Sequence, residues 1–81
     1  VVCFPGQAGT VQEIFQAATE NFYAADASLI APLILVGRQY WTDTYPAWTL
    51  LQRLGAGRPM GQSIYCVDHV YEATSLLTAE T

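Results

Sequence analysis

Three short stretches of the chain are largely apolar: Val1–Phe4, Pro32–Val36 and Ser63–Val67. None shows the alternation of apolar and polar residues that marks a strand with one solvent-facing side. Short aliphatic and β-branched runs of this kind are typical of strands covered on both faces, as in parallel sheets. The pattern therefore predicts parallel strands at these three places.

Between and after these runs, apolar residues recur at every third or fourth position, which indicates amphipathic helices. Helices are expected from Thr10 to about Ala25, from about Thr44 to Ala56, and from about Val70 to Ala79. The inward face of the first would consist of Val11, Ile14, Phe15, Ala18 and Phe22, and that of the second of Trp48, Leu51 and Leu54.

Residues typical of helix ends support these boundaries. Pro46 would lie in the first turn of the second helix, Gly57 just past its end, and Asp68 at the N-cap of the third. Residues 25–31 and 55–62 are expected to be loops.

The predicted order is β-α-β-α-β-α, which gives an α/β fold class with a parallel sheet and right-handed crossovers. Such a unit is half of a doubly wound sheet, and it leaves one sheet edge unpaired. Because Val1 enters a buried strand without a preceding turn or cap, we expect residues 1–81 to be the C-terminal part of one domain whose N-terminal part is missing.

Composition narrows the possible partners. The 81 residues carry a net charge of −4, with three arginines and no lysine, so no basic surface is available for nucleic acid. No apolar run reaches the roughly 18–20 residues of a membrane span, and we expect a cytoplasmic protein. A single phosphate remains possible, because backbone N–H groups at a helix start bind it without net positive charge.

The chain leaves its first predicted strand through a glycine-containing turn and at once enters a helix. This geometry directs free N–H groups at an anion, and Gly6 and Gly9 allow close backbone approach. A P-loop is excluded because the chain has no lysine, and the dinucleotide fingerprint GxGxxG is absent.

Residues 5–13, PGQAGTVQE, resemble the PGGxGTxxE signature of the LOG (Lonely Guy) family, whose members were often labelled possible lysine decarboxylases. The signature matches at every defined position except Gln7, and the surrounding strands and helices resemble the C-terminal half of the family's Rossmann-like three-layer domain. The family hydrolyses the N-glycosidic bond of nucleoside 5′-monophosphates. If the turn holds Gln7 in a left-handed conformation, that residue is strained by about 1–2 kcal/mol relative to glycine.

The resemblance implies a role for each matching residue. The 5′-phosphate would be held by Gly6, Gln7, Ala8, Gly9 and Thr10. Glu13 would be the catalytic carboxylate, because a carboxylate stabilises the oxocarbenium character of the sugar or activates water. The family also uses an arginine upstream of this signature, which has no counterpart here. A homodimer, or the missing N-terminal half, is the expected partner, and no cofactor or metal is expected.

The same residues also allow a purely structural interpretation. Thr10 and Glu13 fit a capping box, which would contribute about 0.5–2 kcal/mol to stability. The additional match at Pro5, Gly6 and Gly9 favours the nucleotide site, although one carboxylate can serve both roles.

Other polar and aromatic residues have plainer interpretations. We expect Tyr40 and Trp41, next to Arg38, to pack as an aromatic cluster under a loop rather than to bind a base. Beside the predicted capping Asp68, we expect His69 to be a surface residue rather than a metal ligand or base.

The remaining candidates are two cysteines and two helix residues. Cys3 and Cys66 are expected to be buried free thiols, without a disulfide or zinc site. Glu20 and Asn21 are expected on a solvated helix face, with a pocket or dimer contact as the alternative.

The sequence therefore predicts a nucleoside 5′-monophosphate phosphoribohydrolase, of cytokinin-riboside-monophosphate or AMP type. The alternatives are a non-catalytic module that binds a nucleotide or molybdenum cofactor, and a structural remnant without a ligand. Nothing in the sequence selects the base.

Overall fold

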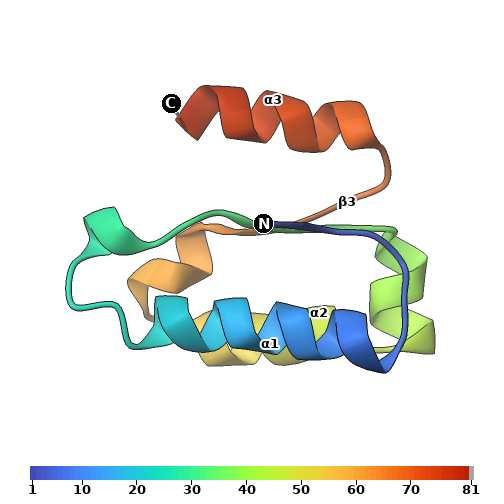
Figure 1. The fold of residues 1–81 in the computed structure, drawn as a ribbon, viewed down its shortest axis with the longest axis horizontal. Coiled ribbons are helices and arrows are strands. Elements are labelled where there is room, and N and C mark those ends of the chain that lie inside the picture. Colours follow the sequence, from blue (N-terminus) through green and yellow to red (C-terminus); the bar gives the residue numbers. More distant parts are fainter. Residues whose placement is uncertain (81) are drawn as a thin grey trace.

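The three apolar runs form one parallel sheet in a computed structural model that describes residues 1–80 (Figure 1). The strands are β1 (Val2–Cys3), β2 (Leu33–Val36) and β3 (Ile64–Val67). They lie in the order β1-β2-β3, with Cys3 opposite Leu35 and Leu35 opposite Cys66. The predicted strands and their parallel pairing are confirmed.

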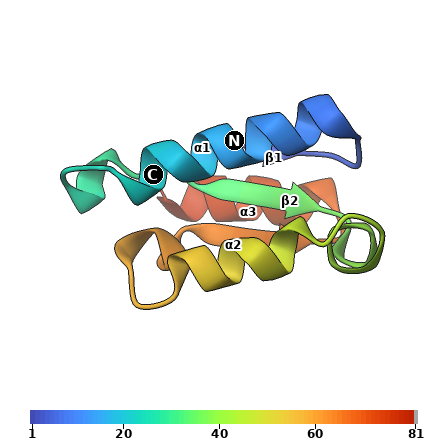
Figure 2. The same cartoon turned by 90° about the horizontal axis from the view of Figure 1, so that it is seen from below.

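Helices cover both faces of this sheet. Helices α1 (Ala8–Phe22) and α2 (Ala47–Gly55) lie on one face, and α3 (Val70–Glu80) lies on the other (Figures 1 and 2). Helix α1 connects β1 to β2, and α2 connects β2 to β3. Because the strands lie in sequential order and both connecting helices lie on the same face, the two crossovers have the same handedness. The described chain is thus an α/β unit with an open three-stranded sheet between two helical layers.

The sheet separates two apolar layers, which explains why its strands lack alternation. Beneath the sheet, the larger layer contains Cys3, Ile14, Ala18, Leu33, Leu35, Trp41, Ala47, Leu51, Met60 and Ile64. Above it, the smaller layer contains Ile34, Val36, Val67 and Ala73. Every residue of β2 is buried because this strand is central.

The inward faces of the helices follow the predicted periodicity with one exception. Ile14 and Ala18 of α1 and Leu51 of α2 are buried, and Trp48 packs against the same core. Leu54 was predicted to point inward, but it is 36% exposed.

The start of the second helix differs from its prediction. A π-helical turn, η2 (Tyr40–Thr44), precedes the helix, which begins only at Ala47. Pro46 therefore occupies the N-cap position rather than the first turn. Gly57 follows the helix with φ +73°, as expected of a residue that reverses the chain after a helix.

Each predicted loop contains one turn of 3-10 helix. These are η1 (Ala27–Leu29) and η3 (Pro59–Gln62). Within residues 1–80, no helix is long and apolar enough to cross a membrane.

Strand β1 forms one edge of the sheet. It pairs with β2 on one side and with no strand of the described chain on the other. The residues flanking it are exposed, with Val1 at 46% and Phe4 at 50%. The predicted unpaired edge is confirmed for residues 1–80.

Candidate functional site

The turn between β1 and α1 contains the glycine-rich residues proposed from the sequence to bind a phosphate. Helix α1 begins at Ala8, because the N–H of Val11 donates to the carbonyl oxygen of Gln7 at 2.9 Å. The N–H groups of residues 8–10 lie before this first intrahelical donor, and they have no acceptor within the described chain. The turn therefore presents free backbone donors at the positive end of a 15-residue helix.

Gly6 and Thr10 contact each other closely. A Cβ atom added to Gly6 would lie 2.8 Å from Thr10 Cβ and would overlap the Thr10 hydroxyl oxygen. Only glycine at position 6 lets this hydroxyl lie over the turn. Thr10 lies inside the helix, so its predicted N-cap role is wrong; Gln7 holds that position and makes no side-chain capping bond.

Gly9 differs from Gly6, because no packing contact in the described chain requires a glycine there. Apart from the adjoining residues and the backbone of α1, no atom of the described chain lies within 4 Å of the position that a Cβ would occupy, and Gly9 is not among the glycines with positive φ. Glycine in a helix is less favourable than alanine by roughly 0.5–1 kcal/mol. Gly9 thus leaves a bare stretch of backbone facing open space.

Gln7 has φ −116° and ψ −135°, so the left-handed conformation considered for it is not present. Its side chain is exposed and makes no capping hydrogen bond. The glutamine at position 7 therefore does not force a side chain into the left-handed region.

The carboxylate of Glu13 is held from the strand side. Cys3 Sγ donates to Glu13 Oε1 at 3.4 Å, and Cys3 is 2% exposed. Burial, then the hydrogen bond to Glu13 and its negative charge, raise the pKa of the Cys3 thiol to about 11. The capping box is wrong, because Glu13 reaches across to β1 rather than back to the N-cap amide.

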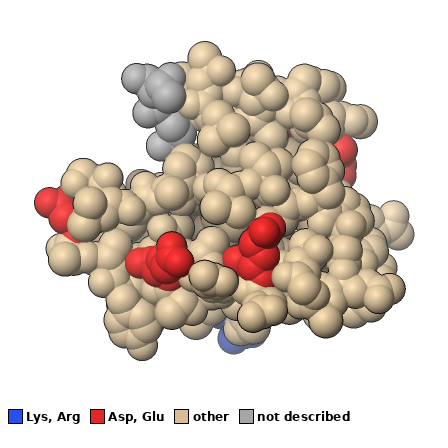
Figure 3. All heavy atoms as spheres, viewed as in Figure 1, with Lys and Arg blue, Asp and Glu red and all other residues tan. Residues whose placement is uncertain are grey.

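A groove beside the start of β1 includes Glu13. It has a volume of about 240 Å³ and is lined by Val1, Glu13, Gln16, Ala17 and Glu20. Gly9 lies one helical turn before Glu13, at the spacing that places two residues on the same helix face. Acidic side chains lie over α1 on this side of the molecule (Figure 3).

Tyr40 connects the turn to the end of β2. Its hydroxyl donates to the carbonyl oxygen of Gly6 at 2.5 Å. Its ring packs edge-on against Trp41 and tilted against Tyr45, at centroid distances of 4.9 and 5.5 Å. Trp41 is fully buried and donates through Nε1 to Val36. The predicted aromatic cluster is confirmed.

Sequence reasoning missed the hydrogen bond from this cluster to the turn. It also missed Gly37, which has φ +105° and would bring a Cβ to 3.4 Å from Pro5 Cγ. The only available signal was a glycine and a tyrosine following the apolar run of β2.

Arg38 points to the β3 side and is not brought to the turn. Its backbone N–H donates to Asp68 Oδ1 at 3.0 Å, its Nε donates to the Cys66 carbonyl at 3.1 Å, and its guanidinium lies 3.7 Å from Asp68 Oδ2. The predicted N-cap role of Asp68 is wrong, because α3 begins at Val70, two residues later, and the Asp68 carboxylate accepts from Arg38 instead of from the helix start. His69 is exposed and stacks on Tyr71 at 5.3 Å, which confirms it as a surface residue.

The two cysteines and Asn21 complete the predicted candidates. Both cysteines are free; Cys3 is buried, whereas Cys66 is partly exposed. Asn21 was expected on a solvated face, which is wrong: it is 7% exposed. Its amide donates to the carbonyl of Ala31 at 2.9 Å and accepts from the Ala31 N–H at 3.2 Å. Glu20 is exposed and lines the groove.

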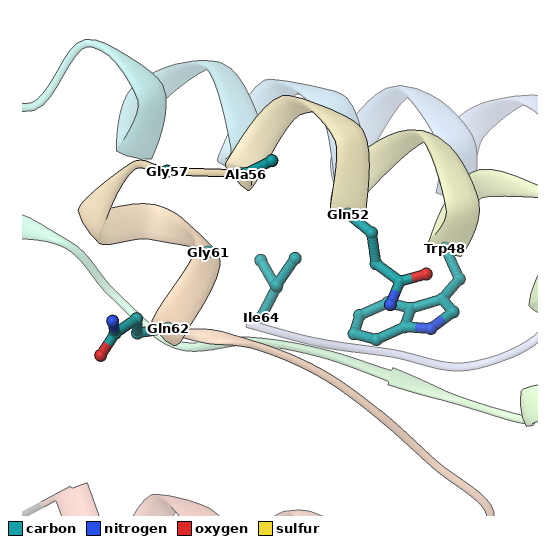
Figure 4. Close-up of a pocket in the computed structure, with 8 residues that line it drawn as sticks. Trp48, Gln52, Ala56, Gly57, Gly61, Gln62 and Ile64 are labelled. Carbon is teal, nitrogen blue, oxygen red and sulfur yellow. The ribbon is translucent and has the colours of Figure 1, made fainter.

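A second cavity, of about 370 Å³, lies at the opposite edge of the sheet between α2, η3 and β3 (Figure 4). Trp48, Gln52 and Gln62 extend around it, and Ile64 forms part of its wall. The described residues contain no group of three or more His, Cys, Asp or Glu side chains arranged to hold a metal ion.

The candidate site thus consists of the Gly6–Thr10 turn, the Glu13 carboxylate and the groove beside β1. Comparisons with family models, curated proteins and solved structures give no match to this chain.

Proposed function

We propose that the chain is the C-terminal part of a Rossmann-like nucleotide-binding domain and acts as a nucleoside 5′-monophosphate phosphoribohydrolase, of cytokinin-riboside-monophosphate or AMP type. The observation that carries the proposal is the bare backbone at Gly9, within a turn that resembles the LOG signature. A residue that weakens its helix and packs against nothing is explained by a ligand that approaches the backbone there.

The turn has the chemistry of a phosphate site. Free N–H groups at residues 8–10 and the positive end of α1 attract an anion without a basic side chain. The Thr10 hydroxyl over Gly6 is a further hydrogen-bond donor for the phosphate. Tyr40 fixes the Gly6 carbonyl, so the turn is organised before a ligand binds.

Glu13 is the catalytic carboxylate in this proposal. It lies on the same helix face as Gly9, so a phosphate bound at the turn would place the attached ribose toward the carboxylate. As the bond from C1′ to the base nitrogen breaks, positive charge develops on the sugar, and the carboxylate stabilises it or accepts a proton from the attacking water. Water adds its oxygen to C1′ and the base leaves with a proton, giving free base and ribose 5-phosphate.

The open edge of β1 requires a partner strand in this proposal. Its backbone groups are unpaired within residues 1–80, and Val1 and Phe4 beside it are exposed. An additional N-terminal half of the domain, or a second copy in a homodimer, would cover this edge and add side chains to the groove.

A non-catalytic module that binds a nucleotide or molybdenum cofactor is the second candidate. It is favoured by the positions of the three arginines, since none lines the Glu13 groove. Arg38 contacts Asp68, and the Arg58 guanidinium lies 3.9 Å from the centroid of the Phe22 ring. Without a cation near Glu13, the turn would bind the phosphate of a nucleotide, and the N-glycosidic bond would not be cleaved.

Glu13→Gln separates the two candidates, with Glu20→Gln as a matched control from the same helix face. Release of free base and ribose 5-phosphate is measured from AMP and from a cytokinin riboside monophosphate. Loss of the Glu13 carboxylate should lower kcat by about 10²–10⁴, while monophosphate affinity stays within about tenfold. Thr10→Ala should instead weaken monophosphate binding first. If Glu13→Gln hydrolyses nucleotides as fast as the parent, the enzymatic proposal is withdrawn in favour of the binding module.

A further inference from the structure

We infer that Cys3 is a positioning residue, whose buried thiol directs the Glu13 carboxylate toward the groove beside β1. The inference rests on the proposed function of Glu13. The observation behind it is the hydrogen bond from Cys3 Sγ to Glu13 Oε1 at 3.4 Å, which joins the edge strand to the second turn of α1.

The hydrogen bond is specific to this pair. Within the described chain, Glu13 makes no other side-chain hydrogen bond and no ion pair. A glutamate on a helix surface otherwise rotates among several rotamers. Cys3, by contrast, is held in place, because it is 2% exposed and lies in β1 opposite Leu35 of β2. The fixed Cys3 thiol therefore selects one orientation of the Glu13 side chain.

The thiol has the protonation state that this role requires. A thiolate would repel the carboxylate, whereas an S–H group donates to it. Because burial and the neighbouring carboxylate raise the pKa of Cys3 to about 11, the sulfur stays protonated at neutral pH. The same burial keeps Cys3 from acting as a nucleophile, since the thiolate is the reactive form.

Burial of the sulfur also leaves the groove open. The donor approaches Glu13 from the core layer, and Glu13 also lines the groove together with Gln16 and Glu20. A polar side chain within the groove would have occupied that space. Cys3 thus orients the Glu13 carboxylate from the core, and the groove on the solvent side of Glu13 remains free for the sugar.

Three substitutions test the role of Cys3. Cys3→Val removes the donor and keeps a slightly larger apolar side chain, Cys3→Ala removes the donor and reduces the volume, and Cys3→Ser keeps a donor of similar size. We expect Cys3→Val and Cys3→Ala to lower kcat about 10- to 100-fold with KM for the monophosphate nearly unchanged, because the carboxylate is misplaced while the phosphate site is intact. Cys3→Ser should recover most of kcat even if its melting temperature falls. Cys66→Ala, which removes the other thiol, should keep the parent kcat.

A direct measurement of the contact needs no turnover. The infrared S–H stretching band of Cys3 should be displaced from that of Cys66 in the unsubstituted protein, and Glu13→Ala should abolish the displacement. The Cys66→Ala variant identifies which band belongs to Cys3.

The outcomes distinguish the inference from the function on which it rests. If the parent hydrolyses nucleotides and Cys3→Val has the same kcat, Cys3 is only a core residue and the proposed function stands. If Cys3→Ser loses as much kcat as Cys3→Val, the donor is irrelevant and the inference is wrong. If the parent hydrolyses no nucleotide, the proposed function fails. If Glu13→Ala leaves the S–H band of Cys3 where it was, the hydrogen bond between Cys3 and Glu13 is not present and the inference is wrong.

Discussion

Substitution of Gly9 by alanine should raise stability and lower phosphate affinity at the same time. No atom lies within 4 Å of the new Cβ and the backbone there does not have positive φ, so the methyl group creates no clash. Replacing glycine in a helix stabilises the fold by up to about 1 kcal/mol, because it restricts the unfolded chain. For a cooperative unit of about 60–100 residues, that corresponds to a rise in Tm of roughly 4–8 °C at the upper limit.

The affinity of the same variant should change in the opposite direction. A methyl group at position 9 would stand where a phosphate oxygen reaches the free N–H groups. Loss of one hydrogen bond to a charged group weakens binding by about 1.5–3 kcal/mol, or roughly 10- to 150-fold. The assay pairs thermal unfolding without ligand with calorimetric titration of AMP.

Gly6→Ala is the matched control for this substitution, because a Cβ there would overlap the Thr10 hydroxyl. It should lower both Tm and affinity. A Gly9→Ala protein that gains stability and binds AMP as the parent does would remove the main support for the phosphate site. A Gly9→Ala protein that loses stability would refute the assignment of open space around this residue.

Three further predictions concern contacts around the site. Tyr40→Phe removes the hydrogen bond to Gly6 and should lower the free energy of unfolding in urea by about 0.5–1.5 kcal/mol, with weaker AMP binding. Asn21→Ala removes both hydrogen bonds to Ala31 and should lower the free energy of unfolding by about 1–3 kcal/mol without changing AMP affinity. Because the folded pKa of Cys3 is raised from 9.0 to about 11, its stabilising contribution is complete below pH 9 and is lost as pH rises toward 11, by at most about 2–3 kcal/mol.

Each of these predictions has a control that removes a similar group elsewhere. Tyr45→Phe and Gln12→Ala should change stability little, because within residues 1–80 neither side chain makes a hydrogen bond to the turn or to the loop after α1. Cys3→Val should reduce the alkaline loss, and Cys66, whose pKa burial also raises, contributes to the remainder. An alkaline loss that Cys3→Val leaves unchanged would contradict the assignment to Cys3.

The strands were predictable because burial on both faces leaves a direct record in the sequence. Strand β2, at the centre of the sheet, is an uninterrupted aliphatic run, and its position matched within one residue at the start. The apolar face of α1 was equally clear, since Ile14 and Ala18 follow the helical period. These features depend on neighbours along the chain.

The polar contacts were not predictable because each depends on a partner distant in sequence. Asp68 was a good candidate for capping by its position, yet it binds a backbone N–H 30 residues away. Asn21 follows the polar face of α1 by composition, but the loop after the helix returns over it and buries it against Ala31. Local preference gives way where tertiary structure supplies a better partner.

Gly6 and Gly9 show the same limit within one motif. The sequence presents them as equivalent glycines of a phosphate signature, and both were expected to allow close backbone approach. In the fold, Gly6 is required by the Thr10 hydroxyl that lies over it, so its presence needs no ligand. Gly9 has no such neighbour, although alanine would suit the helix better. The argument for a bound phosphate therefore rests on Gly9 rather than on the motif as a whole, and one methyl group at that position is enough to test it.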